Sequence, residues 1–96
     1  MNNMKAELLL NERLILSETI FVEMVVWRLP QPLPGSSHQL KYRLALVVAG
    51  HCVLRYDNES GKGDHRHEGS EEKPYIFTSP QGLLKDFWND VDNWRD

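Results

Sequence analysis

One short charged stretch of the chain, YDNESGKGDHRH (Tyr56 to His67), holds two histidines close to a lysine and an aspartate. If the residues after Asp64 are extended, His65 and His67 project to one face and Asp64 and Arg66 to the other, because side chains alternate along a strand. An imidazole has an ordinary pKa of about 6.5, so it can take or give a proton near neutral pH. The two histidines therefore suit general acid and base catalysis on the 2′-hydroxyl and the leaving oxygen of RNA, a reaction that needs no metal and no cofactor.

Basic side chains in and before this stretch could bind the phosphate of such a substrate. Lys62 lies between Gly61 and Gly63, and glycines let a loop curl and present amide groups to an anion. Arginines can stabilise charge that develops on the phosphate, and a tyrosine can stack on a base. The predicted catalytic residues are His65, His67, Lys62 and Asp64. The residues predicted to contact RNA are Arg43, Arg55, Tyr56, Asn58 and Arg66.

The same residues fit other interpretations. Asp64, His65 and His67 could bind a divalent metal, since carboxylate and imidazole are common ligands. The glycines could serve only to form a flexible surface turn with exposed histidines. The remaining histidines, His38 and His51, are interpreted as solvated turn residues, and Cys52 as a buried structural cysteine without a disulfide partner.

The elements that must position these residues are mostly strands. Residues 6–16, with a turn-like break at Asn11-Glu12, and residues 19–29 are rich in aliphatic and aromatic side chains. The segment KYRLALVVA alternates between two faces, and Gly50-His51 then predicts an antiparallel hairpin over residues 44–57. The loop before it, residues 29–38, contains three prolines and cannot continue a ladder.

The C-terminal part predicts a short strand that ends at Ser79 and then a helix. Ser79 is a good N-cap and Pro80 suits the first helical position. An apolar stripe follows at helical spacing: Leu84, Phe87, Val91 and Trp94. We therefore expect an α+β fold, an antiparallel β-sheet meander with a C-terminal α-helix packed on one face, as a single domain over residues 1–96.

Composition and charge limit the function classes. The chain has 96 residues, 41% of them hydrophobic and 26% charged, and no apolar run long enough to cross a membrane. We expect a cytoplasmic protein. The net charge of −3 disfavours indiscriminate coating of nucleic acid. Residues 41–67 carry five cations against three carboxylates, whereas residues 68–96 carry three cations against seven carboxylates. An anion site is therefore expected in the middle of the chain, and a surface for a basic partner near Asp86, Asp90 and Asp92.

The order of several segments resembles that of a known family. KAELLLNERLIL, FVEMVVWRLPQPLPGS, KYRLALVVAGHCVLRYDNESGKGDHRH and PYIFTSPQGLLKDFWNDV are similar to the TumE-type toxins of bacterial type II toxin-antitoxin systems. The resemblance implies a small toxin neutralised by a helix-turn-helix antitoxin, with DNA contacted only through that antitoxin. Three hypotheses follow: a metal-independent endoribonuclease, a non-catalytic binding protein, and a metal-dependent nuclease.

Overall fold

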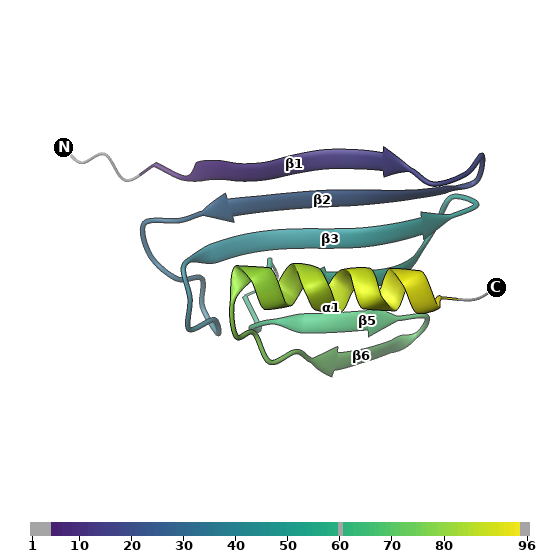
Figure 1. Ribbon diagram of the computed structural model, residues 1–96. Helices are drawn as coiled ribbons and strands as arrows, with labels where there is room; N and C mark the ends of the chain where they lie inside the picture. Colours follow the sequence, from purple (N-terminus) through teal and green to yellow (C-terminus); the bar gives the residue numbers. More distant parts are fainter. Residues whose placement is uncertain (1–4, 60, 95–96) are drawn as a thin grey trace.

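The computed structural model describes residues 5–59 and 61–94, and these residues form one antiparallel sheet and one helix (Figure 1). The strands follow one another in space in chain order, so the sheet is a meander. The predicted α+β fold is therefore confirmed. The elements are β1 (Glu7–Ile15), β2 (Ile20–Arg28), β3 (Leu40–Val48), β4 (His51–Asp57), β5 (His65–Glu68), β6 (Glu71–Pro74) and α1 (Pro80–Asn93).

The first four strands follow from their alternating side chains. Tyr42, Leu44 and Leu46 of β3 lie in the core, as the period of two predicts. The turn-like break predicted at Asn11-Glu12 is wrong, because both residues pair with β2 inside a continuous β1. The irregularity of β1 is instead a register shift between Leu8 and Leu10.

The part after β4 contains more strand than the sequence indicated. The charged loop is shorter than expected, because β4 extends to Asp57 and β5 begins at His65, and β5 forms a hairpin with β6. The predicted strand ending at Ser79 is wrong, because β6 stops at Pro74 on the outer edge of the sheet. The next residue, Tyr75, donates its backbone N–H to the carbonyl of Asp64 at 2.9 Å, and the chain then crosses to the helix.

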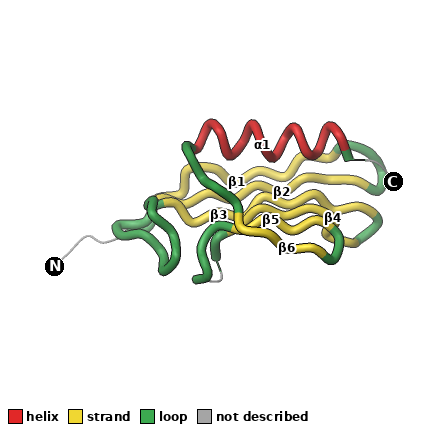
Figure 2. The backbone as a smooth tube through the Cα atoms, turned by 90° about the horizontal axis from the view of Figure 1, so that it is seen from below, coloured by secondary structure: helices red, strands yellow, loops and turns green. Residues whose placement is uncertain are grey.

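The helix begins and is buried nearly as its sequence predicts. The Ser79 side chain accepts a hydrogen bond from the Gly82 N–H at 2.9 Å, and Pro80 lies in the first turn. Phe87 is 0% exposed, but the second fully buried helix residue is Leu83 rather than the predicted Leu84. Figure 2 shows that α1 forms a second layer over one face of the sheet and leaves the opposite face uncovered.

Two further expectations concern exposure. Cys52 is exposed near the start of β4, where the β3–β4 register shifts, so the prediction of a buried cysteine is wrong. Among the described residues, no helix combines the length and the apolar character that a membrane crossing requires.

Candidate functional site

The register of β5 places the two histidines of the charged stretch on the uncovered face of the sheet. His65 pairs with Asp57, Arg66 with Tyr56 and His67 with Arg55. Tyr56 and Arg66 lie on the helix side, because both contact Asp90 of α1. Their neighbours along each strand therefore point the other way. His65, His67 and Arg55 thus share the uncovered face, as the alternation predicted.

Hydrogen bonds define which nitrogen of His65 can exchange a proton. Its Nδ1 lies 2.9 Å from the carbonyl oxygen of Gly63, and a carbonyl only accepts, so Nδ1 carries the proton. Nε2 is therefore the nitrogen that can take up a second proton. It lies 3.9 Å from Oε2 of Glu72, a residue on the neighbouring strand β6.

His67 shares the same carboxylate. Its Nε2 lies 3.4 Å from Oε2 of Glu72 and 2.9 Å from Nη2 of Arg55. A guanidinium only donates, so the neutral imidazole accepts this bond at Nε2. Since both histidine Nε2 atoms lie close to one carboxylate oxygen, they are at most 7.3 Å apart, the sum of their distances to it. Both imidazoles thus lie close to the same carboxylate oxygen.

Arginines extend the site across the sheet. Nε of Arg55 lies 2.6 Å from Oδ2 of Asp57, so this guanidinium joins the carboxylate to His67. Arg43 pairs with Asp57 in the β3–β4 register and lies 3.7 Å from Glu23. Both arginines are part-exposed on the uncovered face, where their guanidinium groups can bind a phosphate oxygen.

Asp64 lies apart from the two histidines, and its carboxylate accepts three side-chain hydrogen bonds. Its side chain is 8% exposed. Oδ2 accepts from Nε2 of His38 at 2.7 Å and from the hydroxyl of Tyr42 at 2.7 Å. Oδ1 accepts from the hydroxyl of Ser36 at 2.9 Å. The pKa of Tyr42 is raised far above its ordinary value, mainly because the residue is buried and also because its hydroxyl donates to Asp64.

The contacts of His38 show that this cluster holds structure. The backbone N–H of Leu40 donates to Nδ1 of His38 at 3.1 Å, so the proton of the ring lies on Nε2 and points at Asp64. Both ring nitrogens are occupied, and the ring stacks on Phe77 with centroids 3.7 Å apart. The prediction of a solvated His38 is therefore wrong. No local sequence signal indicated this cluster, because its members are brought together by loops far apart in the chain.

Two glycines bring those loops together. Gly35 and Gly63 both have positive φ angles, of 85° and 93°. A Cβ atom at Gly63 would lie 2.8 Å from the carbonyl oxygen of Gly35, which is too close for any side chain. Gly63 therefore permits close packing of the two loops, in addition to the turn that the sequence predicted.

The geometry separates the three proposed metal ligands. Asp64 is on the side of Tyr42, whereas His65 and His67 are on the uncovered face. In the part of the chain that the structure describes, no group of three or more histidine, cysteine, aspartate or glutamate side chains is arranged to hold a metal ion. Asp64, His65 and His67 do not converge on one point.

Lys62 remains accessible. It is exposed and lines a polar pocket of about 340 Å³, together with Gly35, Asp64 and Tyr75. The loop around it contains the positive-φ residues Gly61 and Gly63.

Three residues expected to contact RNA are engaged inside the protein. Tyr56 is 3% exposed and its hydroxyl donates to Asp90 at 2.5 Å, so its ring presents no face to a base. Asn58 is 0% exposed, accepts from the N–H of Tyr42 at 3.0 Å and donates to the carbonyl of Leu40 at 2.7 Å. Arg66 pairs with Asp90 at 2.7 Å and with Glu68 at 2.8 Å. Burial thus excludes Tyr56 and Asn58 from an RNA surface.

The acidic side of the helix is also less available than the sequence indicated. Asp90 accepts from both Tyr56 and Arg66, and Asp86 accepts from the hydroxyl of Tyr75 at 2.5 Å. These carboxylates attach α1 to β4, β5 and the segment after β6. Charge reversal there would break internal contacts, so Asp86 and Asp90 are poor candidates for a free docking surface.

Comparison with known proteins gives one finding for nearly the whole chain. A family model described as "Toxin TumE" matches residues 5–95. No curated protein and no solved structure gives a significant match. The matched range includes the uncovered face with its two histidines, the Asp64 cluster and the helix.

Proposed function

The chain belongs to the TumE toxin family, and we propose that it is the toxin of a type II toxin-antitoxin module and cleaves RNA without a metal ion. The observation that carries this proposal is the pair of imidazoles on the uncovered face of the sheet, each with Nε2 beside Glu72. A general acid and a general base placed beside one phosphate can catalyse RNA transesterification.

In the proposed reaction His65 is the base. Its Nε2 is unprotonated in the neutral ring, because Nδ1 donates to Gly63. It takes the proton from the 2′-hydroxyl while the 2′-oxygen attacks the adjacent phosphorus. The bond from phosphorus to the 5′-oxygen breaks, and that oxygen receives a proton from His67. The products are a 2′,3′-cyclic phosphate and a free 5′-hydroxyl.

Glu72 and Arg55 prepare His67 for the acid role. Oε2 of Glu72 lies 3.4 Å from Nε2 of His67 and can position the ring. Arg55 donates to the same nitrogen at 2.9 Å. A phosphate that binds Arg55 competes for this guanidinium and frees Nε2 of His67. Substrate binding therefore makes this nitrogen available to the leaving oxygen.

Basic residues outside the pair position the RNA. Arg55 and Arg43 lie in adjacent strands and neutralise charge on the phosphate that reacts. Lys62, in its exposed loop, contacts a phosphate further along the strand. Arg66, Tyr56 and Asn58 support the sheet and the loops instead, and Asp64 fixes the start of β5 rather than acting on substrate.

Membership of a toxin family implies an antitoxin partner. We propose that this partner is a helix-turn-helix protein and that DNA is contacted through it. The net charge of −3 supports this division, because an acidic chain is a poor general ligand of duplex DNA.

The test is RNA cleavage by the purified protein in excess EDTA. We expect cleavage products with 2′,3′-cyclic phosphate ends, and no cleavage where the 2′-hydroxyl is replaced by hydrogen. His65→Ala and His67→Ala should each lower the rate by about 100-fold or more. The matched control is His51→Ala, which removes an exposed histidine at the opposite end of β4.

The outcomes separate the competing hypotheses. Cleavage that stops in EDTA and returns with added Mg²⁺ would identify a metal-dependent nuclease. No cleavage by a folded protein that still binds its antitoxin would identify a binding protein. Equal losses in the His51 variant and the His65 and His67 variants would contradict the assignment of the site.

A further inference from the structure

The first strand of the sheet is an open edge with an unusual surface. β1 pairs only with β2, so one of its two edges has no strand partner among the described residues. Apolar side chains along and just after it are exposed: Leu8, Leu9, Leu14, Ile15 and Leu16, with Ile15 at 69%. Exposed apolar edge strands pair readily with other chains, so proteins usually protect them.

The opposite edge of the same sheet has that protection. β6 is only four residues long, and its sequence is Glu71-Glu72-Lys73-Pro74. Three charged residues and a proline are common devices that block edge pairing. β1 is nine residues long and contains no proline and no lysine. β6 is therefore a protected edge, whereas β1 is free to pair with another strand.

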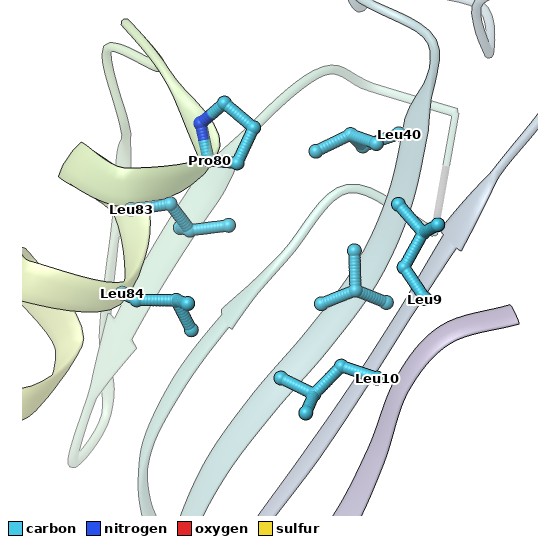
Figure 3. Close-up of a pocket in the computed structure, with 7 residues that line it drawn as sticks. Leu9, Leu10, Leu40, Pro80, Leu83 and Leu84 are labelled. Atoms are coloured by element: carbon cyan, nitrogen blue, oxygen red, sulfur yellow. The ribbon is translucent and has the colours of Figure 1, made fainter.

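An apolar pocket adjoins β1 on the helix side (Figure 3). Its volume is about 230 Å³. Leu9 and Leu10 face Leu83 and Leu84 of the helix across this space, as Figure 3 shows. The lining residues are Leu9, Leu10, Val26, Leu40, Pro80, Leu83 and Leu84. A pocket of this size accepts a leucine or phenylalanine side chain from a strand laid beside β1.

Charge indicates what kind of strand fits. Glu12 pairs in register with the core residue Met24, so it lies on the helix side of β1. Glu12 forms no ion pair with any described residue, whereas Glu7 lies 3.5 Å from Arg28. The only cation of β1, Arg13, lies 4.0 Å from the centre of the Phe21 ring. A second copy of β1 would bring a second Glu12 and no cation to the helix side, so a basic strand from a different protein fits better.

We propose that an extended segment of the antitoxin adds a strand to the free edge of β1, with an apolar side chain in the adjoining pocket and a lysine or arginine facing Glu12. Backbone hydrogen bonds along β1 give the affinity, and the pocket and Glu12 select the segment. The proposal rests on the toxin role of the chain but not on RNA cleavage.

The proposed docking site on β1 lies away from His65 and His67. β1 and β5 are separated by four strand spacings, which is about 19 Å at about 4.8 Å each. Substitutions on β1 should therefore weaken the antitoxin complex without changing cleavage by the free toxin. This separation lets the two proposals fail independently.

The experiment measures binding of the purified protein encoded beside the toxin gene. We expect Leu9→Asp and Glu12→Lys each to weaken binding at least tenfold. The matched control is Glu71→Lys on the protected edge, which should change the Kd less than twofold. Circular dichroism checks that each variant is folded. If Leu9→Asp disturbs the packing of the pocket, Glu12→Lys still tests the proposal, because Glu12 is exposed. Hydrogen exchange of the wild-type complex should show new protection of β1 amides.

Three results would overturn the proposal. The first is wild-type affinity for folded Glu12→Lys and Leu9→Asp variants. The second is protection confined to strands other than β1. The third is a toxin dimer, seen by light scattering without antitoxin, that Leu9→Asp dissociates, because a second copy would then occupy the edge. Absence of RNA cleavage would leave the binding measurement intact and would count only against the catalytic proposal.

Discussion

Replacing Asp64 with alanine should damage stability far more than it damages chemistry. The carboxylate accepts three side-chain hydrogen bonds, from His38, Tyr42 and Ser36. It also lies at the junction of two loops that pack through glycine backbones. Removing it leaves three donors without their acceptor while the surrounding residues stay packed. Asp64 should therefore behave as a structural residue although it lies next to His65 in the sequence.

The size of the effect follows from burial. Tyr42 is fully buried and the side chain of His38 is nearly so. A buried donor left without a partner costs about 1–3 kcal/mol, so the two together cost about 2–6 kcal/mol. The serine hydroxyl adds little, because it still accepts from the amide of Asn58. Since a small domain is stable by about 5–15 kcal/mol, Asp64→Ala should remain folded at low temperature but unfold at much lower urea.

Urea unfolding followed by circular dichroism gives the free energy of unfolding for each variant. Tyr42→Phe removes the hydroxyl that Asp64→Ala would leave unsatisfied. The double variant should therefore lose less stability than the sum of the two single variants, by about 1–3 kcal/mol. Wild-type stability of Asp64→Ala together with loss of RNA cleavage would refute the reasoning and make Asp64 a catalytic residue.

Four other predictions follow from the same structure. Phe87→Ala should lower the free energy of unfolding by about 3–5 kcal/mol, against less than about 0.5 kcal/mol for exposed Lys85→Ala, in urea titrations. Burial and the bond to Asp90 raise the pKa of Tyr56, so the contribution of this residue to stability is complete below the pKa of 10.0 of an unfolded tyrosine and should be lost as the pH rises above it. Tyr56→Phe should reduce this loss of stability at alkaline pH, measured as melting temperature against pH. Lys62→Ala should weaken RNA binding without a change in melting temperature, and the defect should shrink as salt rises in filter-binding assays. Expression of the toxin alone should slow bacterial growth. The double variant His65→Ala/His67→Ala, expressed at the same soluble level, should allow normal growth.

The sequence predicts the fold where a local pattern determines the structure. The alternation of β3 predicts which of its side chains reach the core, and Ser79-Pro80 predicts where the helix begins. The same alternation predicts that His65 and His67 share a face. Each of these features depends on neighbours within a few residues, so one sequence is sufficient.

The missed features depend on contacts between distant residues. His38 and Asp64 are 26 positions apart, and nothing near either residue indicates the partner. Asn58 looks like a polar loop residue, but it replaces strand partners for the backbone of Leu40 and Tyr42. Cys52 lies in an apolar run, yet a register shift beside it places it at the surface. Tertiary packing decides these three cases.

The buried and uncovered faces of β5 are linked through the register of this short strand. A slip of one residue would move His65 and His67 to the helix side and Arg66 to the open face, because the side-chain period is two. The salt bridge between Arg66 and Asp90 of α1, on the helix side of the sheet, opposes such a slip. At the start of the strand, the fixed Asp64 accepts a backbone hydrogen bond from Tyr75, which holds β5 against the segment after β6. Asp64 and Arg66 point away from the uncovered face, and they still determine where the two imidazoles lie.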